Sequence, residues 1–374
     1  MHIDPNEYYG GAEAALTLQD ADDWATRILA KDDLQTPGLF RDPSITKSDA
    51  ATGLLTRGYS LALAPQLIHA RSELLSQLVS SRAAQQVDFL AVGSFFILKP
   101  DSDLMRIPST REDVFSTTAL SMKAKRALMK FLKFVMDYES AEHAEVWKPH
   151  GDVALAQFLE EHFKMDTELR SYIVALTLSL DGEISTKEGL AVIHRHITSM
   201  GVFGPGFAAV YPKWGGLAEI AQVACRSGAV GGAVYMLGTG IKATTAVDAG
   251  SELELTSGDR VKARLVVVRG DGGVGTGSAM GISRLVAVIG SPLKSLFTAT
   301  VEGAPIPAVA VVAFPAGSLT TADGTTSGSP VYLFAHSSET GECPSGQSKF
   351  PTPIYYLLSH ESYDDPNRIL IYIV

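Results

Sequence analysis

A helix expected after Gly216 carries the polar residues whose spacing points most clearly to a binding surface. The stretch from Tyr211 to Arg226 reads as a glycine-rich turn leading into this helix, and Glu219, Gln222 and Arg226 then form one polar stripe. Glu219 and Arg226 are two turns apart, about 10 Å along the axis, so we expect them not to pair with each other. Such charges are free to meet the charges of a partner. The alternative is an ordinary solvated helix face.

No catalytic, metal or cofactor constellation is recognisable in the rest of the sequence. The glycine cluster between residues 271 and 281 could cradle a phosphate, but the residues after it read as a strand, whereas a phosphate loop must open a helix. His194 and His196 are two apart on an expected helix, so they cannot share a metal ion, and nothing else supplies a third ligand. No Gly-x-Ser-x-Gly elbow occurs, and neither cysteine has an activating partner. We therefore expect no catalytic residue, no cofactor and no metal.

Composition and net charge limit the number of domains, the classes of partner and the compartment that we expect. The 374 residues are 46% hydrophobic, enough for one large or two medium domains. The net charge of −10 argues against nucleic acid or an anionic membrane surface as the main partner. Two cysteines cannot build a disulfide framework. No apolar run approaches the roughly 20 residues of a membrane span, and the start of the chain lacks a secretory signal, so the cytoplasm is the expected compartment.

Hydrophobic periodicity predicts a helical stretch between two strand-rich stretches. Residues 115–200 have a helical pattern, with helices at 121–139 and 152–163, one capped by Asp166, and one that starts at Ser185 and ends at Gly201. Further helices are expected at 18–29 and 61–79. Strands are expected at 1–4, 87–92, 94–98, 105–108, 261–269, 285–289, 307–314, 330–334 and 369–374. The pattern predicts an α/β body interrupted by an α-helical domain.

Three blocks of residues occur in the order found in one known family. They are Tyr8-Tyr9-Gly10-Gly11 after a strand-ending acid, Ile107-Pro108-Ser109-Thr110, and the stretch from Tyr211-Pro212 through Glu219 and Arg226 to Tyr235-Met236-Leu237. With these blocks, and with weaker similarity as far as about residue 345, the chain resembles Rab GDP-dissociation inhibitors and Rab escort proteins. The segment from Val114 to Phe134 is more similar to the escort branch.

The resemblance implies a GDI-like α/β fold, in which a sheet-rich domain I related to FAD/NAD(P)-binding domains holds an inserted all-α domain II. We place domain I at residues 1–112 and 201–374, and domain II at residues 113–200. The implied function is to bind GDP-bound Rab GTPases, present them to Rab geranylgeranyltransferase and carry the lipidated product to membranes. The chain would then be a non-catalytic, cytoplasmic accessory component that associates transiently with membranes.

The resemblance also implies roles for particular residues. Tyr9, Glu219, Arg226 and Met236 match the family's Rab-binding residues by position, and Val234 stands where the inhibitors carry a threonine. The geranylgeranyl lipid of the Rab C-terminus needs an apolar cleft, which we expect between the helices of domain II, since each methylene group removed from water contributes about 0.8 kcal/mol.

Phe134 is the candidate for contact with the transferase, because escort proteins dock a phenylalanine of a domain II helix onto that enzyme. On a helical wheel Phe134 lies about 120° from Leu128. There it borders a basic face formed by Lys123, Arg126, Lys130 and Lys133. The alternative is that Phe134 fills the contact with a neighbouring helix.

Departures from the family pattern occur at both ends of the chain. The family's Gly-x-Gly loop is absent before Asp4, and the pattern is lost after about Gln347, so we expect a truncated version with an incomplete domain I. One alternative function is that of a Rab GDP-dissociation inhibitor, which recycles Rabs without transferase contact. Another is a FAD-dependent oxidoreductase on the related fold, although Ala12 follows Gly11 where such enzymes carry arginine or lysine.

Overall fold

The structure is a computed structural model. It describes residues 1–30, 40–47, 56–98, 104–108, 117, 120–204, 207–267, 282–299, 302–320, 324–354 and 368–373.

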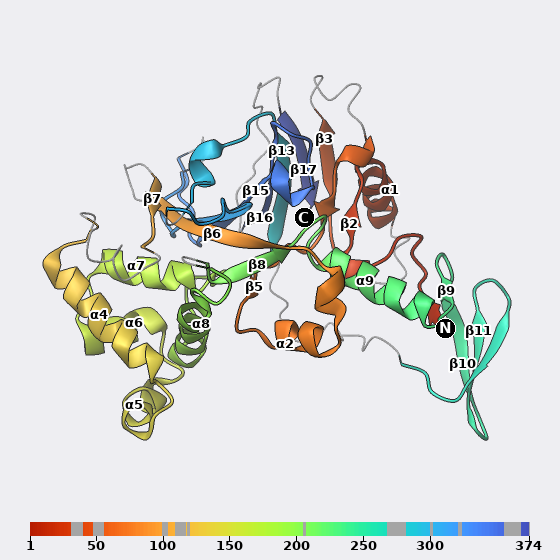
Figure 1. Ribbon diagram of the computed structural model, residues 1–374, viewed down its shortest axis with the longest axis horizontal. Coiled ribbons are helices and arrows are strands. Elements are labelled where there is room, and N and C mark those ends of the chain that lie inside the picture. Colours follow the sequence, from red (N-terminus) through yellow and green to blue (C-terminus); the bar gives the residue numbers. More distant parts are fainter. Residues whose placement is uncertain are drawn as a thin grey trace.

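A large, mostly antiparallel sheet forms the centre of the molecule (Figure 1). Its strands are β3 (Ser44–Lys47), β5 (Ile68–His69), β6 (Phe89–Leu98), β7 (Leu104–Arg106), β8 (Ala209–Pro212), β13 (Ser283–Ile289), β14 (Val309–Phe314), β15 (Val331–Ser337), β16 (Ser348–Ile354) and β17 (Arg368–Ile373). They follow the order β3-β17-β13-β16-β15-β14-β6-β8-β5, and β7 pairs with β6. The pairing of β14 with β6 is parallel.

Both faces of the sheet are covered, as the continuous apolar run of β14 predicts. On one face Ala313 and Tyr332 join the core of the helical region. On the other face Ala310 and Val312 pack with Phe297. The middle strands are therefore buried on both sides, and they give the flanking elements a rigid support.

Five helices form a separate layer against the first of these faces. They are α4 (Met122–Met136), α5 (Ala141–Trp147), α6 (Leu155–Phe163), α7 (Thr167–Leu176) and α8 (Thr186–Ser199). Side-chain hydroxyls of Ser121 and Ser185 and the carboxylate of Asp166 cap three of them. The Tyr332 hydroxyl donates to the Ser179 carbonyl oxygen (2.8 Å), which ties the helical layer to β15.

Smaller elements lie at the other end of the molecule, around α9 (Leu217–Val230) (Figure 1). β1 (His2–Ile3) pairs in parallel with β9 (Tyr235–Met236), and β10 (Ile241–Val247), β11 (Gly250–Leu255) and β12 (Arg260–Ala263) form an antiparallel sheet. The remaining elements are β2 (Ala15–Leu16), β4 (Leu61–Ala62), α1 (Leu18–Leu29) and α2 (Glu73–Ser80). None of the helices in the described ranges is long and apolar enough to cross a membrane.

Most expected elements are present, but several predictions were wrong or incomplete. The strand expected at 261–269 is shorter, because β12 ends at Ala263 and residues 264–267 lie outside any strand. Residues 61–79 do not form one helix, because Leu61–Ala62 pairs with β2 and only α2 is helical. The two strands expected at 87–92 and 94–98 form one strand, β6 (Phe89–Leu98). The helix α5 was not expected at all.

Several sequence predictions fall outside the described residues. These are Ser109 and Thr110 of the second family block, Val114 and Phe115, the boundary between residues 112 and 113, and the glycine cluster at 271–281. The division into domain I and domain II stays a prediction.

Candidate protein-binding site

The first turn of α9 is fixed by contacts from other parts of the chain. Gly216 caps the helix with φ +63°, and a Cβ atom there would lie 2.6 Å from the Tyr211 hydroxyl oxygen, so a side chain does not fit. The Trp214 amide donates to the Thr340 carbonyl oxygen (2.9 Å), and the Ser60 hydroxyl donates to the Trp214 carbonyl oxygen (2.7 Å). The helix therefore starts from a defined position beside the large sheet.

Gly228 allows β9 to approach α9 closely. A Cβ atom at this position would lie 2.1 Å from the Tyr235 hydroxyl oxygen. Glycine inside a helix costs about 1 kcal/mol relative to alanine, and this contact explains its presence here. Because Val234 and Met236 flank Tyr235, the contact places both predicted binding residues beside the helix.

The start of the chain pairs with β9 through backbone hydrogen bonds. The His2 amide donates to the Val234 carbonyl oxygen (2.8 Å), and the Asp4 amide donates to that of Met236 (2.9 Å). The Thr239 amide donates back to the Asp4 carbonyl oxygen (3.0 Å). These bonds hold the turn that carries Tyr9 against the end of α9.

Tyr9 lies in a small aromatic cluster at this end. Its ring centroid is 5.2 Å from that of His2 and 6.0 Å from that of Tyr235, which it meets edge-on. Burial, together with the neighbouring Cys225, Tyr235 and Asp4, raises the pKa of Tyr9 to about 12. The phenol is therefore neutral at physiological pH.

Glu219 and Arg226 form an ion pair, so the expectation that they cannot reach each other is wrong. Arg226 Nη2 lies 3.8 Å from Glu219 Oε1, because the two long side chains bridge the turns between them. The side chain of Arg226 is 59% exposed and that of Glu219 is 20% exposed. Burial raises the pKa of Glu219, and the nearby Asp88 adds to this while Arg226 opposes it. A pair at this distance with its guanidinium largely in solvent is weak.

Tyr9, Val234 and Met236 lie near the C-terminal end of α9, where Figure 1 shows β9 and the N-terminus, and Glu219 and Arg226 lie on α9 itself, with Glu219 in its first turn. We call this surface the α9–β9 platform and define it by Tyr9, Glu219, Arg226, Val234 and Met236. Tyr9 contacts Tyr235, which lies between Val234 and Met236. Tyr9 also interacts with Cys225, which precedes Arg226 on α9, and Arg226 pairs with Glu219, so α9 links the five residues.

Exposed apolar side chains lie on and around the platform. Val230 is 87% exposed, Val234 is 57% exposed and Trp214 is 53% exposed. Apolar anchors beside a charged pair are typical of protein–protein interfaces, whereas a small substrate is usually enclosed in a concave pocket. The platform therefore has the chemistry of a protein-binding surface.

A buried ionic cluster lies beneath the turn that starts α9. Glu342, His336 and Lys349 are 0% exposed. Glu342 Oε1 accepts a hydrogen bond from the Tyr211 hydroxyl (2.8 Å) and lies 3.1 Å from Lys349 Nζ, while its Oε2 contacts His336 Nδ1. Lys349 Nζ also donates to the Ser60 carbonyl oxygen (2.7 Å). The cluster thus joins the β15–β16 region to the same residues that hold Trp214.

The protonation states of this cluster are set by its own members. Burial alone would raise the pKa of Glu342, but Lys349 and His336 outweigh burial and lower it to about 2. Burial lowers the pKa of His336. At neutral pH a carboxylate therefore pairs with an ammonium beside a neutral imidazole. Because these side chains are closed off from solvent, we assign the cluster a structural role.

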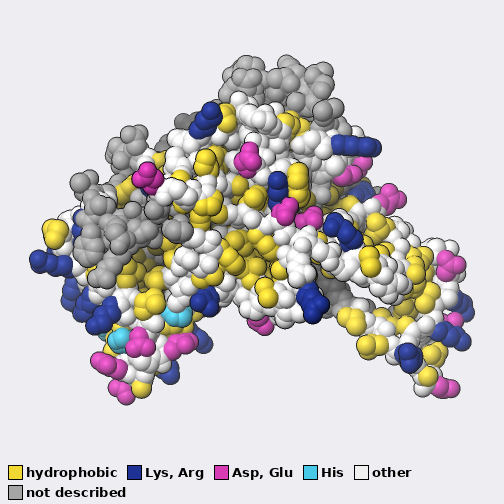
Figure 2. Space-filling model, viewed as in Figure 1, with side chains coloured by type: hydrophobic (Ala, Val, Ile, Leu, Met, Phe, Trp, Pro, Cys, Tyr) yellow, Lys and Arg dark blue, Asp and Glu magenta, His cyan; other side chains and the backbone are white. Residues whose placement is uncertain are grey.

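Phe134 lies inside the helical layer and is 7% exposed. Its ring centroid is 5.3 Å from that of Phe163 and 4.7 Å from that of His143. This is the packing that the alternative interpretation expected, and a role in transferase binding stays a prediction. The basic face of α4 is exposed to solvent and includes Lys123, Arg126, Lys130 and Lys133. Figure 2 shows Lys and Arg side chains gathered over this part of the molecule.

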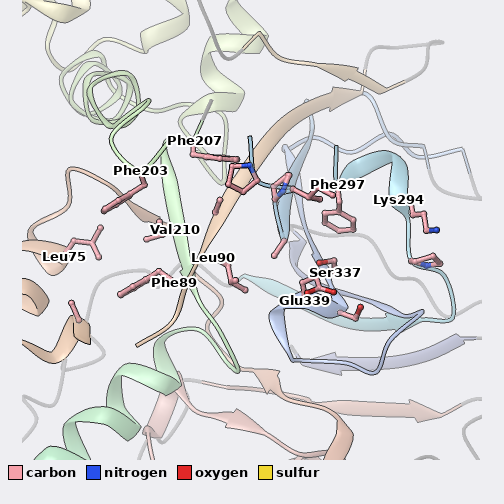
Figure 3. Close-up of a pocket in the computed structure, with 18 of the residues that line it drawn as sticks. Leu75, Phe89, Leu90, Phe203, Phe207, Val210, Lys294, Phe297, Ser337 and Glu339 are labelled. Carbon is pink, nitrogen blue, oxygen red and sulfur yellow. The ribbon is translucent and has the colours of Figure 1, made fainter. Parts of the chain in front are cut away.

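An apolar pocket of about 910 Å³ lies on the sheet next to α2 (Figure 3). Phe89, Leu90 and Val210 line it from the sheet, and Phe203 and Phe207 line it from the segment after α8. Polar groups are confined to a few residues, namely Lys294, Ser337, Ser338 and Glu339. Such a lining can receive an aliphatic chain or apolar side chains, but it offers few groups for orienting a polar substrate.

Sequence reasoning missed this pocket and the buried cluster. The pocket is assembled from distant segments with no common motif, and its residues read as ordinary strand and loop positions. Glu342 and Lys349 also lie in a stretch that the sequence pattern left unassigned. The fold further brings His150, Glu161 and His162 within reach of one metal ion, although the sequence predicted no metal site.

Known proteins resemble this chain in sequence. Residues 1–300 match the model of the family described as GDP dissociation inhibitor. The Saccharomyces cerevisiae protein called Rab proteins geranylgeranyltransferase component A is 32% identical over 240 residues, which are 63% of this chain and 38% of that protein. The Candida albicans protein of the same name is 30% identical over 245 residues, 64% of this chain and 37% of that protein. The chain thus spans well under half the length of these relatives.

A solved structure resembles the fold. The crystal structure of Rab GDI from Plasmodium falciparum matches with a TM-score of 0.66 and 16% sequence identity, covering 99% of this chain and 82% of that one. At this identity the likeness concerns the fold alone, and it confirms the GDI-like α/β fold that the sequence predicts. Since the family match covers most of the sequence, the chain belongs to the GDP dissociation inhibitor family.

Proposed function

We propose that this chain acts as a Rab escort protein. In this role it binds GDP-bound Rab GTPases, presents them to Rab geranylgeranyltransferase and delivers the lipidated product to membranes. Family membership and the names of the fungal relatives support this function. The chain makes no bond itself; it is a non-catalytic cytoplasmic component that meets membranes transiently.

The observation that carries the proposal is the gathering of the five predicted residues on the α9–β9 platform. The weak pair between Arg226 and Glu219 can open towards charges on a GTPase. Val234 and Met236 supply apolar contact area beside it, and the neutral phenol of Tyr9 supplies one more polar anchor. In this proposal the platform is the Rab contact.

The transferase contact is assigned to α4. Its basic face is exposed and can attract an acidic surface on the enzyme, which would raise the rate of association. Phe134 lies directly beneath this face and would reach a partner only after a local rearrangement, since it is 7% exposed. We retain it as the transferase anchor in the proposal, with the basic face as the first contact.

The lipid is assigned to the apolar pocket on the sheet rather than to a cleft within the helices. A C20 isoprenoid gains about 0.8 kcal/mol for each methylene that leaves water. The pocket has a volume in the range of known ligand sites, and Phe203 stands at it with 58% of its surface exposed. A bound isoprenoid would cover this ring.

A second function is recycling of Rabs between membrane and cytosol as a GDP-dissociation inhibitor. The match to the family model described as GDP dissociation inhibitor favours it. The two functions differ in one property, because only an escort protein binds the transferase. A FAD-dependent oxidoreductase is the weakest alternative, and visible flavin absorbance of the purified protein would be its signature.

Titration calorimetry with GDP-loaded, unprenylated Rab, followed by addition of transferase, tests the proposal. We expect a binary complex and then a ternary complex. Rab binding without transferase binding would favour the inhibitor function. Absence of binding to unprenylated Rab would refute the escort function.

A further inference from the structure

Two histidines and a glutamate meet on the surface of the helical layer, far along the sequence from the platform residues. His150 ends the short 3-10 turn Lys148–His150, and Glu161 and His162 lie in the last turn of α6. One ligand atom from each of the three residues lies within 4.8 Å of the other two. The two imidazole centroids are 4.8 Å apart. The residues thus converge although the 3-10 turn and the end of α6 are separated by most of that helix.

This set of side chains matches the ligands of zinc. Two histidines and one glutamate form the protein ligands of several zinc sites, with a fourth position left for water or another ligand. Tetrahedral bonds of about 2.0–2.1 Å place donor atoms roughly 3.3 Å apart. The ligand atoms now lie within 4.8 Å of one another, so modest rotations of the side chains would bring them to that separation. All three side chains are at least partly accessible, so an ion can enter from solvent.

Neighbouring groups hold two of the three ligands in place. Gln157 Nε2 donates to Glu161 Oε1 (2.9 Å), which orients the carboxylate and leaves its second oxygen for a metal. The ring of His162 packs 4.6 Å from that of Phe158, centroid to centroid, which limits its rotation. This is the kind of support that metal ligands commonly have.

The charge of the cluster also suits a cation. Glu161 supplies a carboxylate among the three ligand atoms, which all lie within 4.8 Å of one another. Lys164 and Lys130 are near His162 and oppose a cation.

We propose that His150, Glu161 and His162 form a site for one divalent transition-metal ion, with Zn²⁺ as the ion that fits best. Binding would fasten the turn at His150 to the end of α6. Phe158 and Phe163 of that helix pack around Phe134, so the metal would stiffen the core beneath the basic face of α4. The proposal does not depend on Rab binding.

Titration calorimetry with zinc chloride tests the site, using the tag-free full chain after treatment with a chelator. We expect one Zn²⁺ per chain and no comparable binding of Mg²⁺, which prefers oxygen ligands. His162→Ala and Glu161→Gln should each weaken Zn²⁺ binding by at least about tenfold. His143→Ala is the matched control, because His143 belongs to the same helical layer but not to the cluster, and it should bind Zn²⁺ as the wild type does.

A second measurement tests whether Zn²⁺ stabilises the folded protein. Zn²⁺ should raise the urea concentration at which the wild type unfolds, and this increase should be lost in Glu161→Gln, which keeps the shape of the side chain. The proposal is overturned if the wild type takes up no stoichiometric Zn²⁺. It is also overturned if Zn²⁺ binding persists unchanged in both His162→Ala and Glu161→Gln.

Discussion

Arg226 holds its guanidinium 3.8 Å from Glu219 while more than half of its side chain faces solvent. Such a pair contributes little to stability, because the guanidinium stays largely hydrated, the carboxylate, which is 20% exposed, has lost much of its hydration, and ordering the long side chains costs entropy. A partner carboxylate that approaches Arg226 therefore replaces only a weak interaction with Glu219.

Replacing Arg226 by alanine tests the platform at a single residue. Arg226→Ala should weaken binding of GDP-loaded Rab by about 1–3 kcal/mol, because arginine anchors at interface centres commonly contribute this much. Calorimetric titration measures the change. Arg41→Ala, which removes an exposed arginine away from the platform, should leave the affinity unchanged. Equal affinities of wild type and Arg226→Ala would remove Arg226 from the binding site.

At the scale of the element, α4 combines an internal aromatic contact with an external basic face. Phe131 and Phe134 both face the helical core, where Phe163 packs edge-on against each ring. The basic face borders this aromatic contact, because Lys130 lies one turn before Phe134 and its Nζ extends over the ring of Phe163, 5.6 Å from the centroid. The helix α4 therefore connects a partner bound at its basic face to the aromatic packing inside the helical layer.

Truncating Phe134 separates a packing role from a docking role. Phe134→Ala should lower the free energy of unfolding by about 3–5 kcal/mol, since it leaves a cavity among aromatic rings. Met136→Ala, at a residue of the same helix that is 50% exposed, should change it by less than about 0.5 kcal/mol. Urea denaturation measures both. A stable Phe134→Ala protein that loses only transferase binding would contradict the packing role.

How well the sequence predicted an element depended on how local its signals are. α7 and α8 were predicted from a capping residue and an apolar stripe, both of which lie within the element. The helix expected at 61–79 failed because Leu61–Ala62 pairs with β2, a contact between distant segments that outweighs local periodicity. α5 was missed because its seven residues, ending in Trp147, are too few to show a period.

The same distinction applies to the candidate site. Glu219 and Arg226 were proposed as binding residues because their spacing on one helix is visible in the sequence, and resemblance to the family added Tyr9; these roles stay predictions. The cluster of Glu342, His336 and Lys349 could not be predicted, since Glu342 and Tyr211 are 131 residues apart and meet only in the fold.

At the scale of the whole molecule, the apolar pocket lies between the two proposed protein-binding regions. Figure 1 shows α2 and β8, which line the pocket, between α9 at one end and the helical layer at the other. A GTPase held on the platform could therefore place its lipidated end in the pocket while the basic face of α4 stays accessible. The arrangement suits a carrier that must bind a protein and its lipid together.

A charged residue introduced at the apolar pocket tests whether the lipid of a bound Rab occupies it. Phe203→Asp should weaken binding of geranylgeranylated Rab by roughly tenfold or more, since burying a phenylalanine contributes about 1.5–3 kcal/mol. Binding of unprenylated Rab should not change, because the platform is untouched. Val202→Asp is the control, as Val202 is 43% exposed and does not line the pocket. Equal losses for both forms of Rab would argue against a lipid site here.

The buried ionisable groups make the stability of the molecule depend on pH. Burial lowers the pKa of His69 and that of His196 to about 4, and it lowers that of His336. On acidification the unfolded chain takes up protons first, near pH 6.5, so the stability that these neutral rings contribute above that pH is lost as the pH falls towards 4. The lowered pKa of Glu342 adds a further loss of stability at lower pH, because the stabilisation that its carboxylate contributes disappears between about pH 4.5 and pH 2.

Urea denaturation between pH 7 and pH 4 should therefore show a free energy of unfolding that falls continuously below pH 6.5, by up to about 1.4 kcal/mol per pH unit for each buried histidine. His196→Phe removes one titrating ring and keeps an aromatic ring against Phe95, so its curve should be flatter over this range. His2→Phe, at an exposed histidine, should follow the wild-type slope. If His196→Phe and the wild type lose stability at the same rate, the buried ring of His196 is not a source of the acid sensitivity, and proton uptake by other groups must account for it.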